Sequence, residues 1–206
     1  MELEELKSAW AQYDKKLTKN LKLNEELLRK MNLGKSKKEM NTPQIYEFIS
    51  FITSFIFLLY SIIATITHSN ELKFLIPGII SCLMTIALIY LSGLKIKLLT
   101  EIDFYFSPVI ELQRSMNTFK QKSLEYKKYE FYIFPVFAIS TFPILEIALC
   151  HFDIYKHPTQ FIIGVILSLI LGYSLANWGY KNLFDKKVKN TIKFLDELSK
   201  FENEQI

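Results

Sequence analysis

The sequence predicts an all-α membrane protein, a four-helix transmembrane bundle made of two helical hairpins with amphipathic helices on the cytoplasmic side. Three observations predict this fold. Half of the 206 residues are hydrophobic. Charged residues are nearly absent from four apolar stretches of roughly twenty residues, the length that crosses a bilayer core as a helix. Lysine and arginine gather on alternate connections between these stretches. A soluble globular domain is therefore excluded.

The four predicted spans are residues 45–67, 74–92, 131–150 and 161–180. Each must be helical, because an open strand would leave unpaired backbone groups in lipid. The spans divide the chain into a cytoplasmic helix with a basic connector, a first transmembrane hairpin, a central amphipathic segment, a second hairpin and an amphipathic tail. These segments are residues 1–41, 42–92, 93–130, 131–180 and 181–206.

The distribution of positive charge predicts the orientation. Of the 25 lysines and arginines, 23 lie in residues 1–44, 93–130 and 181–206. The two short connections hold one each, Lys73 and Lys156. Because positively charged segments stay in the cytoplasm, both termini and the central segment are expected there. The first apolar run starts only at residue 45, so no cleaved leader is expected.

The N-terminal segment has a heptad pattern that predicts one helix over residues 2–32. Its apolar seam consists of Leu3, Leu6, Trp10, Tyr13 and Leu17, followed by Asn20, Asn24, Leu27 and Met31. Gly34 is expected to end this helix as a C-cap, and Thr42 with Pro43 to start the first span.

Three interpretations of the seam are open. It lies on the membrane headgroups, packs on the other cytoplasmic helices, or binds a protein partner. Trp10 and Tyr13 are large amphipathic side chains of the kind that anchor interfaces, and polar Asn20 and Asn24 favour a specific register. The basic connector after the seam is expected to contact anionic membrane lipids. No nucleic-acid-binding signature accompanies it, so direct binding to DNA or RNA is not expected.

The central segment and the tail are predicted to form two further amphipathic helices. The second span is expected to continue through Lys95 and Lys97, and a new helix to begin at Ser107 and Pro108. The apolar stripes of these helices comprise Leu112, Met116, Phe119 and Tyr126, then Phe184, Val188, Ile192, Leu195, Leu198 and Phe201. Mutual packing of the cytoplasmic helices would bury these stripes.

Glu146 is the only carboxylate well inside a predicted span, so it is a candidate intramembrane site for ions or protons, with structural pairing as the alternative. The histidines and cysteines show no paired metal-ligand spacing, and no metal site is expected. The sequence has no Walker loop, GxGxxG, GxSxG, HExxH or CxxC motif. Neither catalytic residues nor a cofactor is therefore expected.

Residues 1–10 (MELEELKSAW), Tyr13 to Leu17 (YDKKL) and Leu23 to Lys30 (LNEELLRK) resemble the opening of small multi-span proteins of Bacteroidota encoded beside extracytoplasmic-function sigma factors. These proteins are taken to be membrane-bound anti-sigma regulators. The resemblance implies a bacterial inner-membrane protein whose cytoplasmic helices hold a sigma factor. The zinc-binding His-x3-Cys-x2-Cys motif of many anti-sigma factors is absent, so such binding would depend on helix packing.

The leading functional prediction is a non-enzymatic regulatory or scaffolding protein of the inner membrane that binds a cytoplasmic protein through its N-terminal seam. The alternative is a small transporter or channel subunit, assembled from several copies of the chain, that uses Glu146 and the bundle interior. The two predictions differ in which substitutions should matter, those on the seam or those at Glu146.

Overall fold

The computed structural model describes residues 3–150 and 153–203, and all regular elements in these ranges are helical. The long helices are α1 (Leu3–Thr67), α2 (Leu72–Thr100), α3 (Val109–Cys150), α4 (Pro158–Gly179) and α5 (Lys186–Asn203). A short 3-10 turn, η1 (Ile154–Lys156), precedes α4, and a π-helical turn, η2 (Tyr180–Asp185), joins α4 to α5.

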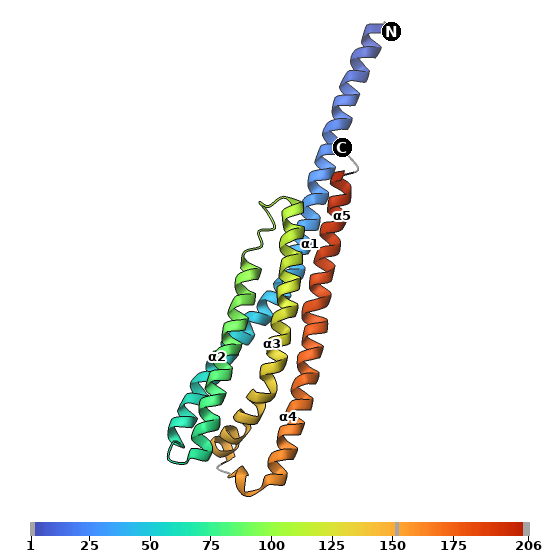
Figure 1. Ribbon diagram of the computed structural model, residues 1–206. Helices are drawn as coiled ribbons and strands as arrows, with labels where there is room; N and C mark the ends of the chain where they lie inside the picture. Colours follow the sequence, from blue (N-terminus) through green and yellow to red (C-terminus); the bar gives the residue numbers. More distant parts are fainter. Residues whose placement is uncertain (1–2, 151–152, 204–206) are drawn as a thin grey trace.

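The helices form an elongated bundle in which the two tight turns, α1 to α2 and α3 to α4, lie at one end (Figure 1). The loop between α2 and α3 lies toward the other end, where α1 and α5 also extend (Figure 1). Four helical segments are long and apolar enough to cross a membrane. The predictions of an all-α fold and of four helices able to span a membrane are thus confirmed for the described residues.

Helix α1 packs on α2 and α5 through one narrow stripe. The buried residues of this stripe alternate in spacing between three and four: Leu33, Ser36, Met40, Pro43 and Glu47. This alternation keeps one face of a helix on its neighbours, as in a coiled coil. The stripe begins only at Leu33, so the bundle holds α1 from that residue onward.

The predicted break between the N-terminal helix and the first span is wrong. Helix α1 continues through both Gly34 and Pro43. Inside a helix, glycine costs about 1 kcal/mol and proline about 3 kcal/mol relative to alanine. The buried stripe runs across Pro43, where packing on α2 and α5 offsets the cost of the proline. Gly34 is exposed at the start of the stripe, and the helix continues through it at the smaller cost. Figure 1 shows α1 bending part-way along its length, and a proline inside a helix is a common cause of such a bend.

The amphipathic stripes of the central segment and the tail pack on each other, as expected. Met116 and Leu195 are completely buried, and Phe119 stacks near Phe184 with ring centroids 5.5 Å apart. Among the described side chains of α1, Leu33 and Met40 belong to this core, and both lie beyond the predicted N-terminal helix of residues 2–32. Helix α2 ends at Thr100 and α3 begins directly after Pro108, which confirms the predicted second helix start.

Close contacts hold the membrane-spanning part together. The Ser81 hydroxyl lies 3.3 Å from that of Ser61 and 2.8 Å from that of Thr141, and so links α1, α2 and α3. A Cβ atom at Gly78 would lie 2.3 Å from the Thr65 hydroxyl oxygen, so α1 and α2 approach closely there. Small residues and interhelical hydroxyl bonds are the usual means by which helices associate in lipid.

An ion pair joins the α1–α2 turn to the α3–α4 connection, at the end of the bundle where these two turns lie. The Lys73 ammonium lies 2.5 Å from an Asp153 carboxylate oxygen and 2.8 Å from Glu71. Asp153 also caps η1 by accepting a hydrogen bond from the Tyr155 amide. The hydrogen bond from Lys73 stabilises the ionised carboxylate and lowers the pKa of Asp153 below its usual value.

Candidate functional site

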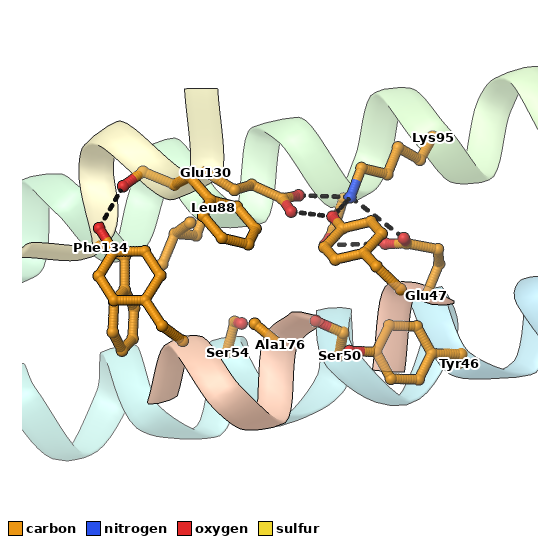
Figure 2. A pocket seen from close by; sticks show the side chains of 13 residues that line it. Tyr46, Glu47, Ser50, Ser54, Leu88, Lys95, Glu130, Phe134 and Ala176 are labelled. Carbon is orange, nitrogen blue, oxygen red and sulfur yellow. Dashed lines mark hydrogen bonds and ion pairs between the residues drawn. The ribbon is translucent and has the colours of Figure 1, made fainter. Parts of the chain in front are cut away.

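Four polar side chains from four different elements meet inside the bundle (Figure 2). They are Glu47 of α1, Lys95 of α2, Glu130 of α3 and Tyr180 of η2. Lys95 and Glu47 are each 1 % exposed, and Tyr180 is 5 % exposed. We call these four residues the charge cluster. The Glu130 side chain is partly buried, at 18 % exposed, and among the described residues no other ion pair is as buried as Lys95 with Glu47.

Lys95 is the centre of the charge cluster. Its ammonium nitrogen lies 3.1 Å from Glu47 Oε1, 2.5 Å from Glu130 Oε1 and 2.5 Å from the Tyr180 hydroxyl oxygen. An ammonium group has three N–H donors, so these three acceptors use all of them. The Tyr180 hydroxyl in turn donates to Glu130 Oε2. Ser92 donates to Glu47 Oε2 at 3.4 Å.

The charge cluster has unequal numbers of charges. With its groups in their ordinary ionised forms, two carboxylates face one ammonium, which leaves a net charge of −1. Burial weakens solvent screening, so both the attraction within the cluster and the excess negative charge act strongly on nearby groups. The site therefore attracts a positive charge and repels an anion.

The positions of these residues follow from the helices that carry them. Glu47 is the third residue of the first predicted span, and Lys95 lies three residues beyond the end of the second. Glu130 immediately precedes the third span, and Tyr180 ends the fourth. The antiparallel bundle brings these four span ends to one level. Tyr180 also opens the π-helical turn, and turns of this kind occur often at functional sites.

A cavity of about 160 Å³ adjoins the charge cluster. Figure 2 shows the space between the cluster on one side and the Phe134 ring on the other, with Ser54 and Ala176 along its wall. Its lining combines aromatic rings, serines and the charged groups: Tyr46, Glu47, Ser50, Ser54, Leu88, Ser92, Lys95, Glu130, Phe131, Phe134, Tyr173, Ala176 and Tyr180.

The predicted seam residues lie outside the bundle. Trp10 is 68 % exposed, Tyr13 is 66 % exposed and Leu17 is 48 % exposed. Leu3 and Leu6 belong to helix α1, but their side chains lie outside the described part of the chain. In the structure these three side chains do not pack on the protein's other helices.

Glu146 does not belong to the charge cluster. It lies sixteen residues beyond Glu130 on α3, roughly 24 Å along the helix. Its side chain is half-buried, and no described residue pairs with it. In the described ranges, no three His, Cys, Asp or Glu side chains gather as metal ligands.

The comparisons with known proteins identify no relative. No family model, curated protein or solved structure matches the chain.

Sequence reasoning missed the charge cluster because each member lies at the edge of a span, where charges are usually hydrated. A signal was nevertheless available. Glu47, Lys95 and Glu130 all fall at the same end of the predicted bundle, within three residues of a span boundary. The charge of the lysine is opposite to that of the two glutamates. Placing the four span ends side by side would have brought them together.

Proposed function

We propose that the protein is a non-enzymatic regulatory or scaffolding protein of the bacterial inner membrane, with both chain ends in the cytoplasm, and that its N-terminal helix binds a cytoplasmic protein. The observation that carries this proposal is the exposed apolar seam on α1. The resemblance of residues 1–31 to proteins encoded beside sigma factors makes a sigma factor the first partner to test.

The direction of the seam supports binding to another protein. Met31 ends the seam and Leu33 begins the buried stripe of α1, so the two features are only two residues apart. A helix turns by 100° per residue, which places these side chains about 200° apart. The seam therefore faces away from the bundle core, and α1 cannot use it to pack on its own bundle.

The reach of α1 argues against a seam that lies on lipid headgroups. Trp10 precedes the first predicted span by 35 residues, and α1 is helical throughout that distance. At 1.5 Å per residue, the indole lies about 50 Å along the helix from the start of the span. A continuous helix directed away from the bilayer carries its apolar side chains into the cytoplasm, where burying them requires a protein surface.

The placement of charges supports the proposed orientation. The two tight turns share one end of the bundle, and their connections hold two of the 25 lysines and arginines (Figure 1). The other 23 lie toward the end at which α1 and α5 extend. The rule that positive charge stays inside then assigns this second end to the cytoplasm.

The test is co-purification with full-length protein in its native membrane. Trp10→Ala removes the largest anchor of the seam, and truncation of such an anchor commonly costs about 2 kcal/mol, more than tenfold in affinity. Lys19→Ala, an exposed position away from the seam, is the matched control. A sigma factor recovered with the unchanged protein and with Lys19→Ala, but lost with Trp10→Ala, is the expected result. Equal recovery with all three proteins, or recovery with none, contradicts the proposal.

A small oligomeric transporter or channel subunit is the second candidate. The observation that favours it is the buried charge cluster with its cavity. This site takes the role of ion site that the sequence analysis gave to Glu146. Under this alternative, Glu47→Gln should abolish ion flux into proteoliposomes, whereas Glu146→Gln should not. Vesicles that show no flux with the unchanged protein would exclude this candidate.

A further inference from the structure

The cavity beside the charge cluster has the size of a small organic molecule. Its volume is about 160 Å³. An engineered protein cavity of about 150 Å³ holds one benzene molecule, which gives the scale. A ligand of roughly five to seven non-hydrogen atoms therefore fits.

The charge cluster selects the sign of the ligand's charge. Lys95 directs its three donors at Glu47, Glu130 and Tyr180, so it has no donor left for an anionic ligand. Within the charge cluster the two carboxylates exceed the single ammonium by one negative charge. The nearby Lys127 ammonium, 4.6 Å from the Tyr180 ring centroid, is balanced by Asp185 at 3.9 Å. A ligand with one positive charge would make the site neutral, whereas an anion would add to an excess that is already costly to bury.

The walls of the cavity indicate what kind of cation fits. Aromatic rings from three helices line the space, among them Phe131 and Phe134 of α3 and Tyr173 of α4. Aromatic faces attract organic ammonium ions. These ions hold their water weakly, so little hydration energy is lost when aromatic rings replace that water. A bare metal ion, by contrast, prefers a shell of several oxygen ligands. Ser50 and Ser54, one helical turn apart on α1, add hydroxyl groups that can accept hydrogen bonds from N–H groups.

We propose that this cavity is a binding site for a small monovalent organic ammonium ion. Glu47 and Glu130 supply the attracting charge, the aromatic rings surround the alkyl groups, and the serine hydroxyls receive any N–H donors. The site does not depend on the proposed role of the N-terminal seam, because it is built entirely inside the bundle.

The experiment uses tetramethylammonium as the probe and the full-length protein in lipid-free detergent micelles. Binding is measured by titration calorimetry and by the rise in thermal unfolding temperature that a ligand of the folded state produces. Tert-butanol is the neutral control of the same size, and sodium chloride is the control for ionic strength. The expected result is saturable binding of tetramethylammonium alone.

Two variants locate the site. Glu47→Gln removes the excess charge and should weaken binding at least tenfold, with Glu146→Gln as the matched control that should not. Ala176→Leu fills the cavity without changing a charge and should abolish binding, whereas Ser174→Leu, on the exposed side of the same helix, should retain it. Should Glu47→Gln fail to fold, the Ala176→Leu and Ser174→Leu pair still decides.

Three outcomes would overturn the proposal. They are no binding of tetramethylammonium, equal binding of tert-butanol, or binding that Ala176→Leu leaves unchanged. Repeating the titration in nanodiscs with and without phosphatidylethanolamine distinguishes the source of the ammonium group. A lipid headgroup that occupies the cavity will raise the apparent dissociation constant of the probe more than tenfold, and a free ion will leave it unchanged.

Discussion

Replacing Lys95 by methionine tests whether the charge cluster is held together as described. The substitution keeps the length of the side chain but removes the positive charge of the charge cluster, so the buried Glu47 and the partly buried Glu130 lose their shared partner. The structure shows three hydrogen bonds from this ammonium, and removal of one partner from a buried ionic group typically costs about 3–5 kcal/mol. We therefore expect Lys95→Met to lower the free energy of unfolding by that amount.

Lys97→Met, two residues along the same helix, is the matched control. The Lys97 side chain is 73 % exposed and lies 3.9 Å from Glu101, so its removal should cost less than about 1 kcal/mol. Equilibrium unfolding by SDS in mixed micelles, followed by circular dichroism, measures both variants. Combining Lys95→Met with Glu47→Gln and Glu130→Gln removes all the charge and should recover most of the lost stability. If Lys95→Met and Lys97→Met have the same free energy of unfolding, the hydrogen bonds of Lys95 do not stabilise the fold.

Three further predictions concern other parts of the molecule. Gly78→Ala should destabilise the protein by about 1–3 kcal/mol, because its Cβ would collide with the first helix, whereas Gly93→Ala, whose nearest neighbour lies 3.9 Å away, should be neutral or stabilising; thermal unfolding compares the two. Asp153→Asn should be less stable than the unchanged protein at pH 7. Because the pKa of this carboxyl is lowered by folding, its contribution is present above the ordinary aspartate pKa, and the difference should vanish as the pH falls below about 4 in a series of unfolding curves. In a background in which serine replaces Cys82 and Cys150, a cysteine at Thr159 should react with an impermeant thiol reagent outside intact cells and one at Lys38 should not; the reverse result would invert the proposed topology.

Hydropathy was sufficient to predict the four membrane-spanning segments. Placing a charge in lipid is costly, so stretches that can cross a membrane stand out by their lack of charged residues. Local signals at Ser107 and Pro108 also predicted a helix start correctly. The signals at Gly34 and Pro43 were of the same kind and failed. At Pro43 the buried stripe continues on both sides, and tertiary packing outweighed a local preference of a few kcal/mol. Gly34 lies where the stripe begins, and its cost of about 1 kcal/mol was too small to end the helix.

The charge cluster could not be derived from hydropathy for a different reason. An average over a window discards the direction in which each side chain points, and a charge near a span end then looks like an ordinary interfacial charge. Glu146 drew attention because it lies deeper along its span, yet it has no described partner. Burial of Glu47 and Lys95 depends instead on the register between helices α1 and α2, which the sequence of either helix alone does not contain.

Because α1 is one continuous helix, it connects the seam directly to the charge cluster. Glu47 and Trp10 lie on the same helix, 37 residues or roughly 55 Å apart. Because the bundle holds α1 from Leu33 onward, the free lever runs from Leu33 to Trp10, 23 residues or roughly 35 Å, and a tilt of about 5° at its base displaces Trp10 by roughly 3 Å. Had Gly34 ended the first helix, as its sequence predicts, such a tilt would have been absorbed at the break. In the proposed regulatory protein, a change in how α1 sits against Lys95 is therefore carried to the partner surface by the helix itself.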